Sequence, residues 1–347
     1  MQFSMKQLTS ADKLFFFERN FFTLDGMWMI EAEKELSWQT ALKIDLNVWK
    51  NLLKIIIRRI KRYLHLKENS LANLVNILTF RWSAEGWKYK VINLENNKAE
   101  IRVTVCPYKS AMDRNPERHN KIALICKDMC IPFYEAVIKE FNQEIKLNRT
   151  CHMGLGDSFC DFQFVSRESI SEENYFDWID ENRRKLSIED KLFYFEKNFR
   201  TLDGLWVIET ENEINWKTAL KLDIIVWQEL YKIIFRRVKK YLNLESNSLL
   251  DLIKIVSFVW NCEGNFHEII KVNDNEIIIN INTCPYIEAM QRNPKRHNHI
   301  ASICKDMCIP YFEPVVKEFN PKIKILRDKF IGLGDNICNF HFKIEDH

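Results

Sequence analysis

The 347-residue sequence lacks the features that would assign it to several special classes of protein. It has no uninterrupted apolar run of the ~18 residues that a membrane-spanning helix needs. Its opening, MQFSMKQLTSADK, has no apolar core followed by a small-residue cleavage site, so we expect no signal peptide. Lysine and arginine total 51 against 48 acidic residues, and no basic stripe of the kind that binds nucleic acid is present. We therefore expect a cytoplasmic protein with no membrane and no nucleic-acid partner.

The composition is that of a globular protein, with 46% hydrophobic and 29% charged residues. The length suits two domains, each large enough to bury a core. The chain has ten cysteines. In a reducing compartment, cysteines are more often thiols or metal ligands than disulfides.

Eight of the ten cysteines form two sets with the same spacing, 178 residues apart: Cys106, Cys126, Cys130, Cys160, and Cys284, Cys304, Cys308, Cys338. Residues 11–165 align with 189–343 at this offset without a gap, and about half of the positions are identical. The chain is therefore a tandem duplication. We predict a first repeat at 1–165, a linker at 166–188 and a second repeat at 189–347, which form an internal pseudo-dimer related by an approximate two-fold axis.

The residue pattern within one repeat predicts an α+β domain, with an N-terminal helical part and a small antiparallel sheet that carries an inserted helix. Apolar residues three or four apart predict helices, and alternation predicts strands. The helices are expected at 12–33 (with a possible break at Asp25-Gly26), 38–66, 70–82 and 115–142, and the strands at 87–94, 99–107 and 159–164. Pro132 lies inside the last helix and should kink it near Asp128 to Cys130.

One cluster of residues has the composition of a chemical site. His119, Cys126 and Cys130 are seven and four residues apart, which on a helix places them on one face. His119 would lie about 10 Å along the axis from Cys126, too far for a direct hydrogen bond. The remaining candidates are near strand ends or turns, and the second copy repeats the plan: Cys106, Cys160, Asp157, and then His297, Cys304, Cys308, Cys284, Cys338, Asp335.

Three interpretations of the cysteines remain open. They can pack as small buried apolar residues. Each quartet can bind zinc or an iron–sulfur cluster, although the spacings of 20, 4 and 30 residues match no common metal motif. A cysteine can act as a nucleophile, with His119 as its base and Asp157 orienting the base. The leading nucleophile or ligand pair is Cys126 with Cys130, and Cys304 with Cys308 in the second copy.

Two arginine pairs, Arg58-Arg59 and Arg236-Arg237, lie among apolar residues of a predicted helix. One arginine of each pair should be half-buried. A carboxylate-bearing ligand or an internal acidic residue would explain this position. Since buried arginines are usually paired, we favour the internal acidic residue.

Several short motifs occur in the same order in both copies: DG-x-W, A-L-K-x-D-x-x-V-W, C-P-Y, C-x3-C-x-P and G-x-G-D-x-x-C-x-F. In these motifs the chain resembles prokaryotic proteins grouped with L-2-amino-thiazoline-4-carboxylic acid hydrolase. The last motif is also similar to the vinyl-reductase-type, TRAPP-like small-molecule-binding domain. The hydrolase resemblance implies opening of a sulfur-containing ring to give N-carbamoyl-cysteine. It also implies that each cysteine quartet lines the pocket.

Two classes of function follow. The first is a small-molecule hydrolase that acts on a C–N or C–S bond through a cysteine-rich pocket in each repeat. The second is a sensor or carrier that binds a metal, an iron–sulfur cluster or a small ligand without catalysis.

Overall fold

The structure is a computed structural model that describes residues 7–95, 97–167 and 184–345. Most of the predicted linker lies outside these residues. The first copy contains α1 (Ser10–Glu35), α2 (Trp38–Tyr63), α3 (Leu71–Glu85), β1 (Lys88–Glu95), β2 (Lys98–Val105), α4 (Pro107–Asp113), η1 (Pro116–Lys121), α5 (Ile122–Leu124), η2 (Ile125–Cys130), α6 (Ile131–Phe141), β3 (Ile145–Asn148), η3 (Met153–Leu155) and β4 (Cys160–Ser166). The second copy contains α7 (Ile188–Glu213), α8 (Trp216–Tyr241), α9 (Leu249–Glu263), β5 (Phe266–Val272), β6 (Glu276–Thr283), α10 (Pro285–Gln291), η6 (Pro294–His299), α11 (Ile300–Ser302), η7 (Ile303–Met307), α12 (Cys308–Phe319), β7 (Ile323–Leu326), η8 (Ile331–Leu333) and β8 (Cys338–Ile344).

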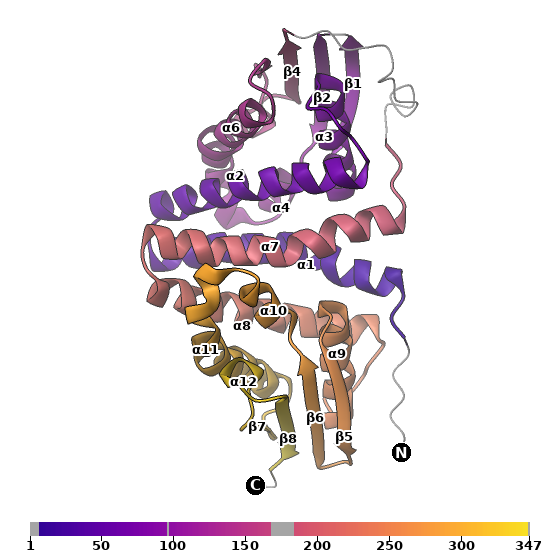
Figure 1. Ribbon diagram of the computed structural model, residues 1–347, viewed down its shortest axis with the longest axis vertical. Helices are drawn as coiled ribbons and strands as arrows, with labels where there is room; N and C mark the ends of the chain where they lie inside the picture. The colour runs from indigo at the N-terminus through magenta and orange to yellow at the C-terminus, as the bar shows by residue number, and fades with distance from the viewer. Residues whose placement is uncertain (1–6, 96, 168–183, 346–347) are drawn as a thin grey trace. The chain divides into compact units, whose positions relative to one another are not determined.

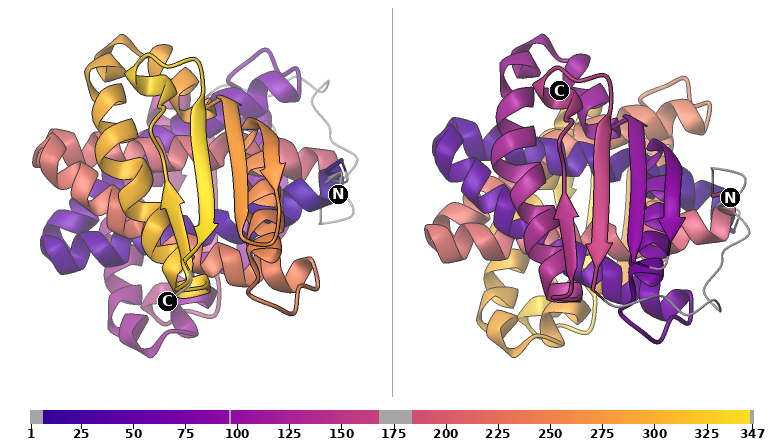
Figure 2. Two further views of the ribbon diagram at one scale, coloured as in Figure 1. Left: turned by 90° about the horizontal axis from the view of Figure 1, so that it is seen from below. Right: turned by 90° about the horizontal axis from the view of Figure 1, so that it is seen from above.

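Each copy contributes one four-stranded antiparallel sheet, with strand order β1-β2-β4-β3 or β5-β6-β8-β7. Figure 2 shows both sheets, with α6 alongside β3 in one and α12 alongside β7 in the other. The helix α3 packs across its own sheet and against α2, and most of its side chains are buried. The predicted α+β tandem organisation is confirmed.

The third helix of the first copy begins as its sequence indicates and runs to Glu85, three residues past its expected end at Trp82. Ser70 caps α3 by accepting a hydrogen bond from the backbone N–H of Asn73, and Ser248 caps α9 in the same way. Gly86 ends α3 with φ at 82°, a left-handed conformation that favours glycine.

The first helix of each copy packs with the other copy. The compact units are Leu36–Glu209, called here the first body, and Met1–Glu35 with Thr210–His347, called the second body. The helix α1 therefore belongs to the second body, where it packs along α8 and α9, and α7 belongs to the first body, where it lies along α2 (Figure 1). The compact units thus differ from the boundaries of the sequence repeats. The internal pseudo-dimer stays a prediction.

Equivalent aromatic and polar contacts hold each exchanged helix. In the first body, Phe193 stacks on Tyr63 with ring centroids 4.0 Å apart. In the second body, Phe15 stacks on Tyr241 at 3.9 Å.

The half-buried arginines face these exchanged helices, and the expectation of an acidic partner was wrong. Arg59 Nη1 donates to Asn198 Oδ1 at 2.7 Å, and Arg237 Nη1 donates to Asn20 Oδ1 at 2.7 Å. Each also donates to a carbonyl oxygen of the same helix. An asparagine and a carbonyl oxygen satisfy the guanidinium without burying a second charge.

Two expectations about helix continuity also need correction. The helix α1 runs through Gly26 without a break. The single helix expected from 115 to 142 is instead the 3-10 helix η1, the short α5, the π-helix η2 and α6. Pro132 lies in the first turn of α6 and has no N–H for the carbonyl of Asp128, and a wider π-helical turn lies where the kink was expected.

Among the residues that the structure describes, every helix is too short or too polar to cross a membrane.

Candidate functional site

The sheet brings the two strand cysteines of each copy close together. Cys160 begins β4 and pairs with Val103 of β2, and Cys106 follows the end of β2, three residues beyond that pair. Cys338 and Ile281 form the same pair in the second copy. The strand register thus places both thiols at one end of the sheet.

The π-helix η2 supplies the other two thiols, and the turn η3 contacts one of them, Cys126, as well as Cys160. The backbone N–H of Met153 donates to Cys160 Sγ at 3.2 Å, and the next N–H, of Gly154, donates to Cys126. A Cβ atom on Gly154 would lie 2.0 Å from Cys126 Sγ, so only glycine fits there. The second copy repeats this approach, with Gly332 against Cys304.

A half-buried arginine completes the cluster, and the sequence reasoning missed it. Arg149 Nη1 lies 3.6 Å from Cys130 Sγ, and its guanidinium also faces Cys160. In the second copy, Arg327 Nη1 donates to Cys308 Sγ at 2.8 Å. The signal that could have found this residue is its identity in both copies at the common offset.

Each arginine stacks on an aromatic ring of β4 or β8. The Cζ atom of Arg149 is 4.1 Å from the ring centre of Phe162, and that of Arg327 is 4.2 Å from Phe340. This cation–π contact fixes the guanidinium beside the thiols. We call Cys106, Cys126, Cys130, Cys160 and Arg149 the first thiol cluster, and their equivalents the second.

The pKa of most thiols in the clusters is raised, which favours the neutral form. Burial raises the pKa of Cys126 to about 12 and that of Cys304 to about 11. Burial also raises the pKa of Cys106 and of Cys160, and for Cys160 the N–H of Met153 and the charge of Arg149 oppose the rise. These thiols stay protonated near pH 7 because desolvation disfavours the thiolate.

Arg149 itself is held in its charged form. Burial acts to lower its pKa, but the neighbouring Cys130 and then Cys160 leave the pKa above its ordinary value. Arg327 behaves in the same way beside Cys308 and Cys338. Arg149 lies at hydrogen-bond distance from Cys130, and Arg327 lies at hydrogen-bond distance from Cys308. Each guanidinium also acts on the cysteine that begins the last strand, Cys160 or Cys338.

The structure places the predicted histidines away from the thiols. His119 is exposed on η1, and its Nε2 lies 2.7 Å from the carbonyl oxygen of Asp113. His297 makes the equivalent hydrogen bond with the carbonyl of Gln291 at 2.8 Å. The two rings tie η1 and η6 to the short helices before them.

Asp157 and Asp335 orient the turns rather than a histidine base. Asp157 Oδ2 accepts a hydrogen bond from the backbone N–H of His152 at 2.6 Å, and Asp335 accepts one from Phe330 at 2.7 Å. Each carboxylate closes the turn whose next two N–H groups reach the thiols.

No group of three or more His, Cys, Asp or Glu side chains is arranged to hold a metal ion within the described ranges. The spacing of the quartets had left zinc and iron–sulfur binding open. The guanidinium of each cluster lies where a second positive charge would be repelled.

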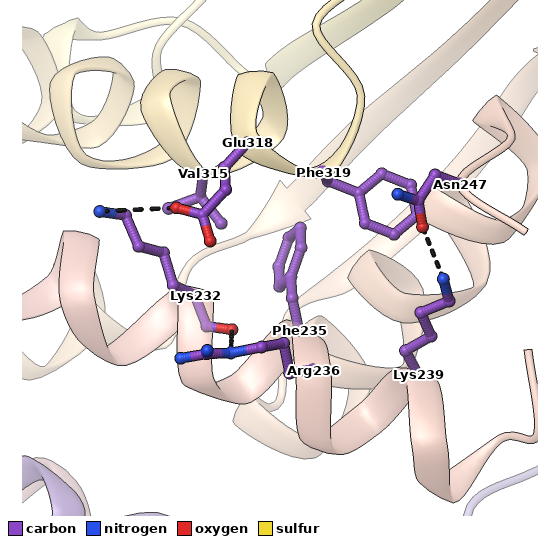
Figure 3. Close-up of a pocket in the computed structure, with 8 residues that line it drawn as sticks. All are labelled: Lys232, Phe235, Arg236, Lys239, Asn247, Val315, Glu318 and Phe319. Atoms are coloured by element: carbon purple, nitrogen blue, oxygen red, sulfur yellow. Dashed lines mark hydrogen bonds and ion pairs between the residues drawn. The ribbon is translucent and has the colours of Figure 1, made fainter.

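A separate hollow of about 220 Å³ lies in the second body between α8 and α12 (Figure 3). Lys232 of α8 lies 3.6 Å from Glu318 of α12, so this pair links the two helices. Lys239 donates to Asn247, which precedes α9, at 2.6 Å. The first copy has the same residue at every lining position but one. The lining contains no cysteine: Lys232, Phe235, Arg236, Lys239, Asn247, Val315, Glu318, Phe319. We interpret it as a helix-to-helix contact.

Comparison with known families separates the two copies. Residues 17–164 match the model of a family described as L-2-amino-thiazoline-4-carboxylic acid hydrolase. Residues 183–327 match the model of a family of unknown function, DUF6125. No curated protein and no solved structure was found to match the chain. The relation to the hydrolase family that the motifs indicated is therefore confirmed for residues 17–164.

Proposed function

We propose that the chain is a thiol-dependent hydrolase that opens a C–N or C–S bond of a small molecule, with Cys130 as nucleophile and Cys308 as its equivalent. The observation that carries the proposal is the arginine–cysteine contact, which recurs in both copies. It modifies the prediction that paired Cys126 with Cys130. The raised pKa of Cys126 suits a thiol that supports the turn.

The relation of residues 17–164 to the hydrolase family supports this reaction class. The Cys130 thiolate would attack the electrophilic carbon of a C=N or C=O group and form a C–S bond. Collapse of the adduct would break the bond to the leaving nitrogen or sulfur, which takes a proton from water. A water molecule would then hydrolyse the enzyme-bound acyl group and release the thiolate.

Arg149 would hold the thiolate before attack and after its release. Its aromatic contact with Phe162 and its hydrogen bond from Nε to the carbonyl oxygen of Asp161, 3.1 Å long, keep the guanidinium in place. A lysine at this position would lose the planar stacking and the second hydrogen bond.

The test uses L-2-amino-thiazoline-4-carboxylic acid, because it is the compound in the description of the matching family. Opening of its C–S bond releases a thiol that a thiol reagent detects after the protein is removed. We expect the double variant C130S/C308S to lose turnover at least 100-fold. The matched control is C126S/C304S, which removes the thiols bound by the turn and should keep the nucleophile.

Equal turnover in C130S/C308S and the parent chain would overturn the assignment of the nucleophile. Ligand binding by calorimetry with no turnover in the parent chain would favour the non-catalytic binding function instead. Metal analysis of the same preparations tests zinc or iron independently of activity.

A further inference from the structure

The two thiol clusters differ in the residues that surround the arginine. His152 of the first copy is replaced by Phe330 in the second, and Asp161 is replaced by Asn339. The cysteines, the arginine and both glycines of the turn are the same in both copies. The groups that can transfer a proton have therefore changed, while the thiol and its guanidinium have not.

His152 lies at the start of the turn that holds the thiols. Its backbone N–H is bound by Asp157, and the N–H of the next residue, Met153, donates to Cys160. Its Nδ1 atom is buried and makes no hydrogen bond of normal geometry to a described residue, while the backbone of Arg149 lies near enough to the ring to act against the lowering of its pKa. A buried ring nitrogen without a partner is costly unless something binds it, so it is available to a ligand or a water molecule.

The equivalent ring in the second copy shows which group this position faces. Phe330 has its ring centre 4.4 Å from Cζ of Arg327, which donates to Cys308. The same position in the first copy therefore presents an imidazole beside Arg149. The charged groups that act on His152 are Arg149, Asp161 and Asp157. Burial and then Arg149 lower its pKa, so the ring is neutral at pH 7 and can accept a proton.

We propose that only the first thiol cluster completes the hydrolytic cycle, with His152 as the base that activates water, and that the second cluster stops at the acylated cysteine. This inference rests on the proposed function. In the step concerned, neutral His152 takes a proton from water as the water oxygen forms a bond to the acyl carbon. The C–S bond to Cys130 then breaks, the thiolate returns to Arg149, and the imidazolium releases its proton to solvent.

The two copies also match different family models. The match to the hydrolase model includes His152, Asp161 and the whole first quartet, since it covers residues 17–164. The match in the second copy is to a different model and ends at Arg327, before Phe330 and Cys338.

The experiment uses p-nitrophenyl acetate, which acetylates a reactive thiolate and releases coloured p-nitrophenolate. In the full chain carrying C308S, we expect a burst of about one equivalent followed by continued release. In the full chain carrying C130S, we expect a burst of about one equivalent that then stops, with a persistent gain of one acetyl group by intact-protein mass spectrometry. Continued release from the C130S chain at the rate of the C308S chain would overturn the inference.

Two variants of the base keep the test independent of folding defects. We expect H152F in the C308S chain to retain the burst, which reports an intact cluster, and to slow the later release at least 100-fold, the range for a general base. H152Q, which keeps a polar side chain, should behave in the same way. An unchanged release rate in either variant would show that His152 is not the base. If the parent chain shows no burst at all, the nucleophile assigned under the proposed function fails instead.

Discussion

The ion pair between Arg81 and Glu85 offers a test of how the first body is stabilised. Both side chains lie on α3, with exposed fractions of 1% and 0%, and Nε of Arg81 lies 2.9 Å from Oε1 of Glu85. Trp87 Nε1 also donates to the carboxylate, at 2.8 Å. The substitution Arg81→Val would leave this carboxylate buried beside only neutral donors. Breaking a buried pair in this way costs about 3–5 kcal/mol in the free energy of unfolding.

The second copy shows how a valine is accommodated at this position. Val259 stands where the first copy has Arg81. Tyr231 stands where the first copy has Leu53, and its hydroxyl lies 3.2 Å from Glu263. In the second copy, the valine thus occurs together with an uncharged hydroxyl group that contacts the glutamate.

The assay is native-state hydrogen exchange of the α3 amide groups in urea, which measures the first body separately from the second. The double variant R81V/E85Q removes the unbalanced charge as well, so its loss should be smaller than that of R81V alone. The exposed pair Arg102–Glu100 provides the matched control, and R102V should cost at most about 1 kcal/mol. A loss for R81V no larger than that for R102V would refute the reasoning.

Much of the fold could be predicted from the sequence because its signals are local. Ser70 and Gly86 mark the ends of a helix through a hydrogen bond and a left-handed φ that depend on nearby residues only. The hairpin and the final strand follow from alternation, and the duplication follows from the common offset.

The exchange of α1 and α7 could not be predicted in this way. Hydrophobic periodicity shows which face of a helix is buried, but it does not show which copy supplies the partner. Phe15 on Tyr241 and Phe193 on Tyr63 are equivalent contacts between equivalent residues, so packing within a copy and packing between copies satisfy the same pattern.

The convergence of the four cysteines on one pocket stays a prediction. The register that places Cys106 and Cys160 at one end of the sheet depends on strands that are readable from periodicity. The position of His119 depends on a 3-10 turn of 3.0 residues followed by a wider π-helical turn, so a constant period of 3.6 misplaces it. Arg149 follows the end of β3, where no periodic pattern indicates the direction of a side chain.

Two further predictions concern single polar groups. Substitution of Asn198 by alanine removes the acceptor of a half-buried guanidinium and should lower the free energy of unfolding of the first body by about 1–3 kcal/mol. Hydrogen exchange should show the same loss of unfolding free energy in the second body for Asn20→Ala. If neither variant loses stability, these asparagines do not help to hold the exchanged helices. The last prediction concerns Asp161. Burial acts to raise its pKa, but hydrogen bonds from Cys151 and Thr150 prevail and leave the pKa below its ordinary value of 3.8. As the pH falls, the Asp161 carboxylate is therefore protonated in the unfolded chain before it is protonated in the folded chain. Its contribution to the free energy of unfolding is present above pH 3.8 and is lost as the pH falls through the lower folded-state pKa. D161N removes this titration and still accepts both backbone N–H groups, as Asn339 does, so its unfolding free energy should fall less between pH 5 and acid pH. Identical pH dependence in the two chains would show that Asp161 does not contribute to acid stability.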